Sequence, residues 1–260
     1  MENVRCEGSN ICYSDQGKGD VIVLLHGFCG SAEYWEKVIP GLIKDYRVIA
    51  PDLRGHGASD APLGAYTIEQ MADDVLSLLN TLEIQECYLL GHSLGGYITL
   101  SFAQRHASRL KGFGLIHSTG YPDSEEAKEN RLRSVSMIQS EGIFAFVDQL
   151  VPGLFAPGAA TQLVERAKEI GYKTPPQGAA GAALAMRERP DRRDVISATA
   201  LPVLLVAGAE DSKVAPAQTF TSDNRNVTKV TLDGVGHMSM FEAPEQLAQS
   251  IKDFVLSANG

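Results

Sequence analysis

The sequence predicts an α/β protein with a doubly wound, mostly parallel sheet flanked by helices and an inserted helical cap. Three observations lead to this prediction. Apolar runs such as VIVLL and PVLLVA do not alternate with polar residues, which is typical of parallel strands buried on both faces. Segments with helical periodicity lie between these runs. One stretch of about seventy residues, 121–190, lacks any strand pattern and predicts a helical excursion.

Short apolar runs bounded by turn residues predict the strands. The first run precedes Asp-Gln-Gly-Lys-Gly, which favours an antiparallel hairpin at the sheet edge. In chain order the predicted strands are Ile11–Tyr13, Val21–Leu25, Arg47–Ala50, Cys87–Leu90, Phe113–Ile116, Val203–Ala207 and Val227–Leu232.

Helices are predicted between these strands. Apolar residues recur at helical spacing from Ile68 to Leu82 and mark one amphipathic face. A second helix, Leu94–His106, follows a strand at once, and a third, Pro244–Leu256, begins at a proline. Within the cap, helical patches alternate with Gly and Pro at Ser124–Glu141, Gly142–Leu150, Ala160–Gly171 and Gly178–Glu188. We therefore expect a core of residues 1–120 and 191–260, with residues 121–190 as the cap.

The composition limits the partners. The chain has 260 residues, with 23 Lys and Arg against 32 Asp and Glu, and a net charge of −9. An acidic chain without a basic block repels phosphate backbones and anionic membranes, so we expect neither nucleic acid nor membrane as a partner. No apolar run approaches the ~20 residues that span a bilayer, and no signal peptide is visible. The oligomeric state cannot be predicted from the sequence.

The cysteine pattern indicates a reducing compartment. Cys6, Cys12, Cys29 and Cys87 form no CxxC motif. This favours free thiols and a cytoplasmic location. A bridge between Cys6 and Cys12 across the expected hairpin stays open.

The segment Gly91-His92-Ser93-Leu94-Gly95-Gly96 follows a predicted strand and precedes a predicted helix. A serine at such a corner sits on strained backbone, so its neighbours two positions away must lack bulky side chains. Gly91 and Gly95 meet that need. The helix also points its free N–H groups at the serine, which favours a developing oxyanion. We predict that Ser93 is a nucleophile.

Serine needs a base held by a third group. Asp211 follows the strand PVLLVA in Gly-Ala-Glu-Asp, and His237 follows the last strand in Gly-Val-Gly-His. Sites in open α/β sheets gather at the carboxyl ends of strands, so the three side chains should converge. We prefer Asp211 as the acid over Asp123, which lies beside Pro122 at the start of the helical excursion, and over Glu210, which should point away.

The loop after VIVLL reads His26-Gly27-Phe28-Cys29-Gly30, and its glycines would let the backbone approach a substrate. We expect the oxyanion hole to use the backbone N–H groups of Phe28 and Leu94.

With these motifs the chain resembles the α/β-hydrolase fold superfamily, in its capped esterase, enol-lactonase and haloperoxidase-like branch. The resemblance rests on the His-Gly-Phe loop, the PDLRGHGAS stretch at Pro51–Ser59, the GHSLGG elbow, and the GAED and GVGH loops. These motifs span residues 21 to 237, outside the cap. The resemblance implies that the PDLRGHGAS stretch is chiefly structural, and no chemical role is assigned to Asp52 or His56.

The resemblance implies a carboxylic ester hydrolase that acts on a small ester or lactone through an acyl-enzyme. Serine at the elbow, in place of the aspartate of epoxide hydrolases and haloalkane dehalogenases, favours acyl transfer. Carbon–carbon bond hydrolysis and cofactor-free perhydrolysis on the same triad stay open, as does a slow-turnover receptor for a small ligand.

The substrate pocket is the least determined feature. We name Phe144, Phe146, Phe155 and Met238 as candidate lining residues. A cap arginine could bind a substrate carboxylate; helix-face arginines in water are the more common case. The candidates are Arg131 and Arg133, with Arg187, Arg189, Arg192 and Arg193 near the cap's exit. No dinucleotide fingerprint, P-loop or metal-ligand cluster is evident, so we expect no cofactor and no metal.

Overall fold

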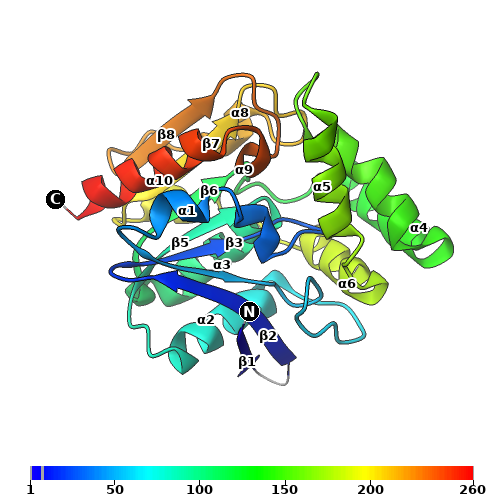
Figure 1. Ribbon diagram of the computed structural model, residues 1–260, viewed down its shortest axis with the longest axis horizontal. Helices are drawn as coiled ribbons and strands as arrows, with labels where there is room; N and C mark the ends of the chain where they lie inside the picture. Colours follow the sequence, from blue (N-terminus) through cyan, green and yellow to red (C-terminus); the bar gives the residue numbers. More distant parts are fainter. Residues whose placement is uncertain (1, 7–8, 260) are drawn as a thin grey trace.

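The computed structural model describes residues 2–6 and 9–259. Its centre is an eight-stranded sheet in the order β1-β2-β4-β3-β5-β6-β7-β8 (Figure 1). From β4 to β8 neighbouring strands are parallel, whereas β2 is antiparallel to both β1 and β4. The predicted fold class is confirmed. The strands are β1 (Glu2–Cys6), β2 (Ser9–Gly17), β3 (Val21–Leu25), β4 (Arg47–Pro51), β5 (Cys87–His92), β6 (Leu110–Ile116), β7 (Val203–Gly208) and β8 (Val227–Leu232).

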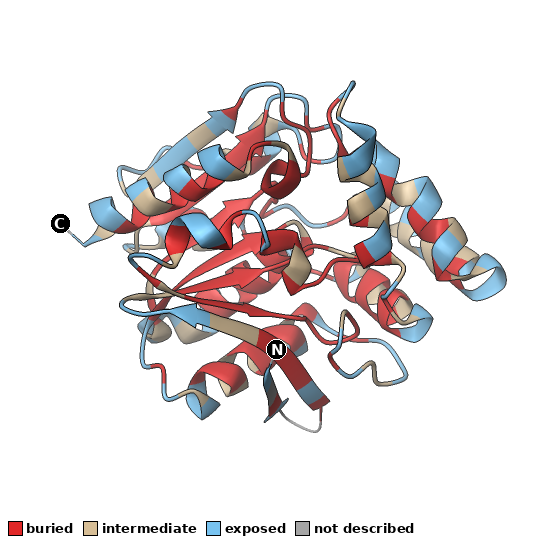
Figure 2. Cartoon of the chain, viewed as in Figure 1, coloured by how far each residue is buried: buried red, intermediate tan, exposed pale blue. Residues whose placement is uncertain are grey.

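Both faces of the sheet are covered, because side chains of a strand alternate between two apolar clusters. In β3, Ile22 and Leu24 join one cluster, and Val23 and Leu25 join the other. Helices α1 (Ile39–Leu42) and α10 (Pro244–Ala258) contribute to the first cluster, and α2 (Ile68–Thr81) and α3 (Leu94–His106) contribute to the second. Figure 1 shows these two pairs on opposite faces of the sheet, and Figure 2 shows the central strands buried throughout.

Sequence patterns missed the polar and short elements. The strand β1 reads ENVRC and carries no apolar run; it is held at the edge by pairing with β2. The pairing sets Cys6 opposite Ser9 and Cys12 opposite Asn3, so the two cysteines are not cross-strand partners. The side chain of Cys6 itself lies outside the described residues. Other unpredicted elements are η1 (Ala32–Trp35), α1, η2 (Ala107–Arg109), η3 (Val151–Leu154), α7 (Arg193–Ala198), α8 (Pro216–Thr219) and α9 (Ser239–Glu242).

Helices fill the connection between β6 and β7, and it contains no strand among its residues, all of which are described. We call α4 (Glu125–Leu150), η3 (Val151–Leu154), α5 (Thr161–Gly171) and α6 (Pro176–Arg187) the connection helices. They lie together at one end of the sheet (Figure 1), where α4 packs against α6 and α5. At Gly142 the backbone leaves helical geometry (φ 86°, ψ 171°), so α4 is kinked where the sequence predicted a break.

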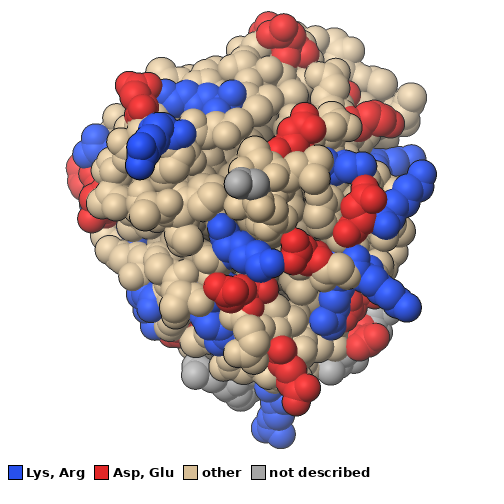
Figure 3. Space-filling view, turned by 90° about the vertical axis from the view of Figure 1, so that its left-hand side faces the viewer, with Lys and Arg blue, Asp and Glu red and all other residues tan. Residues whose placement is uncertain are grey.

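On the face shown in Figure 3, acidic and basic side chains are interspersed rather than gathered by sign. None of the described helices combines the length and the hydropathy needed to cross a bilayer.

Candidate active site

Ser93 occupies a sharp corner between β5 and α3. Its backbone lies in the left-handed region (φ 50°, ψ −111°), which is strained for a residue with a side chain. A Cβ placed on Gly91 would lie 2.1 Å from the Gly95 carbonyl oxygen, and one on Gly95 would lie 2.6 Å from that of Leu25. Both positions therefore require glycine, as the elbow motif predicts.

Two hydrogen bonds from the end of β6 hold this corner. The Ser93 N–H donates to the Ile116 carbonyl at 3.0 Å, and Ser118 Oγ donates to the Ser93 carbonyl at 2.7 Å. Among the described residues, Ser93 Oγ makes no hydrogen bond, and the residue lines a cavity of about 400 Å³ that His237 also lines. Catalytic hydrogen bonds are often long without substrate.

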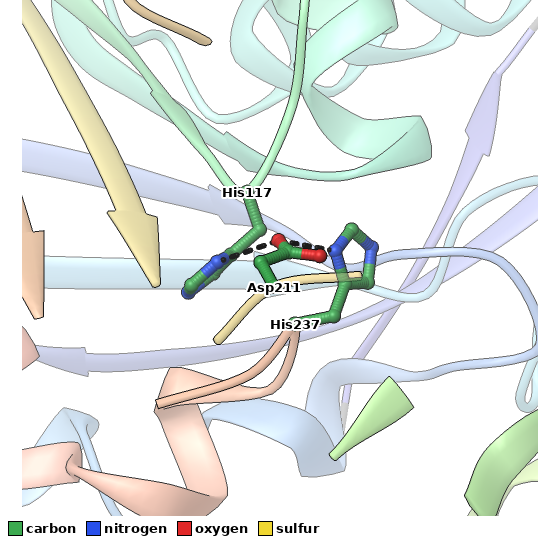
Figure 4. A group of neighbouring side chains, drawn as sticks. All are labelled: His117, Asp211 and His237. Atoms are coloured by element: carbon green, nitrogen blue, oxygen red, sulfur yellow. Dashed lines mark hydrogen bonds and ion pairs between the residues drawn. The ribbon is translucent and has the colours of Figure 1, made fainter. Parts of the chain in front are cut away.

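The predicted acid and base meet directly. His237 Nδ1 lies 2.8 Å from Asp211 Oδ2 (Figure 4), and both side chains are buried. With Nδ1 as the donor, Nε2 is the basic nitrogen of the ring. The two loops touch closely, because a Cβ on Gly208 would lie 2.2 Å from the Gly236 carbonyl oxygen. The carboxyl ends of β7 and β8 thus bring Asp211 and His237 together.

The Asp211 carboxylate is held in its ionised form. Its Oδ1 accepts hydrogen bonds from the Lys213 and Val214 N–H groups at 2.8 and 3.0 Å. Burial alone would raise the pKa of Asp211, but hydrogen bonds from His117 and His237 outweigh burial and hold the pKa well below its usual range.

The rival acid, Asp123, has different partners. Its Oδ1 lies 2.6 Å from Arg189 Nη1, and its Oδ2 accepts from Arg131 Nε at 3.1 Å. Asp123 is therefore committed to two guanidinium groups, whereas Asp211 bonds the imidazole of His237.

His117 was not predicted to take part, yet its Nδ1 lies 3.1 Å from Asp211 Oδ2 (Figure 4). It stands at the end of β6 with left-handed backbone (φ 49°), and its ring is fully buried. Burial lowers the pKa of His117, so the ring is a neutral donor to the carboxylate. The only sequence signal was its place at a strand's carboxyl end.

His117, Asp211 and His237 also form a potential metal-ligand group, since one ligand atom from each lies within 4.8 Å of the others. Both Nδ1 atoms are already engaged with the same carboxylate oxygen, Asp211 Oδ2. Among the described residues, His117 Nε2 is buried and has no hydrogen-bond partner.

Glu242 is a second residue that sequence reasoning missed. Its Oε2 accepts from the N–H groups of Gly236 and Met238 at 3.1 and 3.2 Å, on either side of His237. Its Oε1 accepts from the Ala156 N–H at 2.7 Å, and the His237 N–H donates to the Leu154 carbonyl at 2.7 Å. The loop that carries His237 is thus held between the Glu242 carboxylate and the last residue of η3, Leu154.

The predicted oxyanion donors are the backbone N–H groups of Phe28 and Leu94. Among the hydrogen bonds of the described residues, none uses the backbone N–H of Phe28 or of Leu94. A Cβ on Gly27 would lie 3.3 Å from the Ser93 Cβ, so the loop that carries Phe28 packs directly against the serine. Two unused backbone donors therefore flank the elbow.

The predicted pocket residues need correction. Phe146 lines a second cavity of about 220 Å³ beside the first, but Phe144, Phe155 and Met238 line neither. Phe144 is 61% exposed and stacks on Tyr172, because α4 changes direction at Gly142. Phe155 packs against Phe241, and Met238 is wholly buried in the core. The first cavity is lined by Phe28, Tyr34, His92, Ser93, Tyr97, Ala127, Asn130, Arg131, Ser134, Leu150, Leu154, Met186, Lys213, Val214 and His237.

Further buried histidines support the loops around the site. His26 Nδ1 contacts the Gly27 carbonyl, and its Nε2 accepts from the Leu53 N–H at 2.9 Å. Burial lowers the pKa of His26 to about 4 and that of His56 to about 3. Asp52 accepts from the N–H groups of Ala32 and Ala58 at 2.7 and 2.8 Å, and neither Asp52 nor His56 lines the cavity with Ser93. These residues join loops.

Comparisons with known proteins agree with the fold. A family model described as "alpha/beta hydrolase fold" matches residues 20–244. The 2-(acetamidomethylene)succinate hydrolase of Mesorhizobium japonicum is 29% identical over 253 residues, covering 93% of this chain and 90% of the relative. A thermophilic esterase from Thermogutta terrifontis, solved with malate bound, is 31% identical with a TM-score of 0.94 and covers 100% of both chains. The enol-lactonase from Burkholderia xenovorans LB400 is 27% identical with a TM-score of 0.90, covering 98% of this chain and 100% of that chain.

Proposed function

The chain belongs to the α/β-hydrolase fold family and is a hydrolase; on that premise we propose that it cleaves small esters or lactones through an acyl-enzyme on Ser93. The observation that carries the proposal is a single cavity lined by the strained Ser93 and by His237, whose Nδ1 lies 2.8 Å from Asp211. The similarity to an esterase and to an enol-lactonase supports the substrate class.

In the first half of the reaction, His237 Nε2 takes the proton of Ser93 Oγ as the oxygen attacks the ester carbonyl. The negative charge that develops on the carbonyl oxygen is received by the N–H groups of Phe28 and Leu94. Asp211 stabilises the imidazolium that forms, and the ring then gives its proton to the departing alcohol.

In the second half, water attacks the acyl-enzyme and His237 again acts as the base. The products are the free acid and Ser93 in its original state. For a lactone, the departing alcohol stays attached to the acyl group, so one product is released.

We also propose that residues 121–190 act as a cap on the core formed by residues 1–120 and 191–260. The support is that α4 and α6 contribute six residues to the lining of the cavity: Ala127, Asn130, Arg131, Ser134, Leu150 and Met186. A cytoplasmic location remains our proposal, supported by the buried thiols of Cys29 and Cys87, which form no disulfide.

The test uses an active-site label and one substitution. A fluorophosphonate should modify the protein once, at Ser93, and Ser93→Ala should lower kcat on p-nitrophenyl butyrate by about four to six orders of magnitude. Ser134 lines the same cavity, so peptide mapping must separate the two serines. Labelling at Ser134, or full activity of Ser93→Ala with an unchanged melting temperature, would refute the nucleophile.

A further inference from the structure

The cavity that Ser93 lines also carries two positively charged side chains, Arg131 and Lys213. Helix α4 lines the cavity with Ala127, Asn130, Arg131 and Ser134, whose spacing places them on one helix face. Lys213 reaches the same cavity from the loop that follows Asp211. Arg131 and Lys213 both line the adjoining 220 Å³ cavity as well, so they stand where the two cavities meet.

The Arg131 guanidinium is fixed by one ion pair and keeps other N–H donors unused. Its Nε donates to Asp123 Oδ2 at 3.1 Å, which fixes the guanidinium, and its side chain is only 25% exposed. Asp123 also pairs with Arg189, so one carboxylate serves two guanidinium groups and leaves a net positive charge. No other hydrogen bond or ion pair of the Arg131 side chain is found among the described residues, and its terminal nitrogens remain available.

Lys213 is a cation without a partner in the described chain. Its backbone N–H bonds Asp211, but its Nζ takes part in no hydrogen bond or ion pair there. The Nζ lies against η3, because a Cβ placed on Gly153 would be 3.2 Å away from it. The ammonium group is thus kept at the cavity beside the catalytic acid and is not drawn to a surface carboxylate.

The lining of the two cavities itself contains no negatively charged side chain. None of the residues that line either cavity is Asp or Glu, although the chain carries 32 of them and a net charge of −9. On the outer face in Figure 3, by contrast, cations and carboxylates are mixed. A concave site walled by a guanidinium, an ammonium and apolar groups attracts anions and holds them by charge-assisted hydrogen bonds.

We propose that the natural substrate is a small ester or lactone that bears a free carboxylate, which Arg131 and Lys213 bind while Ser93 attacks the ester carbonyl. A guanidinium fork matches the two oxygens of a carboxylate, and the lysine adds a point charge on the other side. The proposal rests on the proposed ester hydrolysis and deepens it by naming the substrate class.

The test compares two esters of similar length, p-nitrophenyl hemisuccinate with a free carboxylate and p-nitrophenyl pentanoate without one. The kcat/KM for the hemisuccinate divided by the kcat/KM for the pentanoate measures the selectivity for the free carboxylate. We expect the ratio to fall at least tenfold in Arg131→Met and severalfold in Lys213→Met, and to fall with rising salt in the wild type. The Arg131→Lys variant should retain part of the wild-type selectivity for the free carboxylate.

The matched control is Lys128→Met, which removes one positive charge from the same helix at a position outside both cavities. Its ratio should equal that of the wild type. A ratio that is unchanged in the Arg131 and Lys213 variants, or that falls equally in Lys128→Met, would overturn the proposal. Lys213 is exposed, so its variant tests the site even where Arg131→Met fails to fold.

A binding measurement separates this proposal from the catalytic one. Glutarate should bind the Ser93→Ala protein in a calorimeter and bind severalfold more weakly when Lys213→Met is added. Binding without any hydrolysis of either ester by the wild type would refute the proposed function and leave the carboxylate site standing. Hydrolysis of both esters with no glutarate binding would refute only the carboxylate site.

Discussion

The loops at the carboxyl ends of the strands and the connection helices meet at one cavity, but they are built differently. In the loops, Asp211, His117 and His237 are buried and joined by hydrogen bonds, and Ser93 is held at φ 50° by close packing. The connection helices contribute one face of α4, which carries small polar side chains and Arg131, and also the apolar side chains of Leu150, Leu154 and Met186. Side chains that are buried and held in fixed positions, as in the loops, suit catalysis of the reaction. A helix face whose side chains can be exchanged without disturbing those groups suits the selection of the substrate.

The largest expected effect comes from the loop side. Asp211→Asn would leave the His237 ring without its anionic partner and in the wrong tautomer, which costs about 10⁴-fold in turnover in serine proteases. We expect a fall in kcat of that order on a neutral ester. Asp123→Asn should leave kcat on that ester near the wild-type value, while its melting temperature falls because Arg189 loses its ionised partner.

Measuring kcat and thermal melts of the two variants side by side shows which carboxylate orients His237. The reverse ranking would move the acid to Asp123. Small and equal effects would mean that another group orients His237.

Lowering the pH from neutral should reduce stability through histidines in the loops rather than in the connection helices, because residues 121–190 contain no histidine. Burial lowers the pKa of His26 to about 4 and that of His56 to about 3, from 6.5. Above pH 6.5 both rings are neutral in the folded and the unfolded chain. As pH falls from 6.5 towards 4, only the unfolded chain takes up these protons. The free energy of unfolding should then fall by about 1.4 kcal/mol per pH unit for each ring.

Urea denaturation at pH 8, 7, 6 and 5 measures this slope. His56→Gln should make the slope shallower by up to one proton, even if the variant is less stable overall. A free energy of unfolding that does not change from pH 7.5 to pH 5 would show that the buried rings are charged in the folded protein.

Sequence patterns indicated which loop residues lie together, but not which helix residues line the cavity, for a physical reason. The elbow, the acid and the histidine each depend on a strand and a few neighbouring residues, such as the glycines that flank Ser93. Pocket lining depends on how helices orient over the sheet. The kink at Gly142 turns Phe144 outward, and no local pattern gives that angle.

Long-range contacts were the other blind spot. His117 lies 94 positions before Asp211, and Glu242 reaches back 86 positions to Ala156. In the sequence each is a single polar residue near a strand or helix end. Their roles appear only when the sheet brings those ends together.

A smaller effect should follow from loosening the junction between the two regions. Gln at position 242 keeps the shape of the side chain but replaces one acceptor oxygen by an amide, so at least one of the Gly236, Met238 and Ala156 N–H groups loses its partner. Misplacing a catalytic ring by about 1 Å can cost about 10²-fold. We expect Glu242→Gln to lower kcat by about tenfold to a hundredfold with little change in KM, since Glu242 does not line the cavity.

Glu245→Gln, a few residues on and exposed, is the matched control and should behave as the wild type. A rise in KM without a fall in kcat would place Glu242 in substrate binding and contradict a positioning role.

The smallest expected effect concerns the helix side, where contact with Phe146 should set the preferred length of the acyl chain. Its ring lines the 220 Å³ cavity beside Phe28, with ring centroids 5.8 Å apart. Phe146→Ala should lengthen that cavity and shift the preference between p-nitrophenyl acetate, butyrate and hexanoate towards longer chains, by about tenfold per methylene that gains contact.

Phe144→Ala removes the same ring from a position stacked on Tyr172 in solvent, so its chain-length profile should match the wild type. Phe155→Ala should lower stability by about 3–5 kcal/mol, because its ring is buried in the core against Phe241, and should leave the profile unchanged. A shift in the Phe144 variant together with none in the Phe146 variant would mean that the acyl chain lies on the outer side of α4, and the division between loops for chemistry and helices for selectivity would have to be redrawn around that surface.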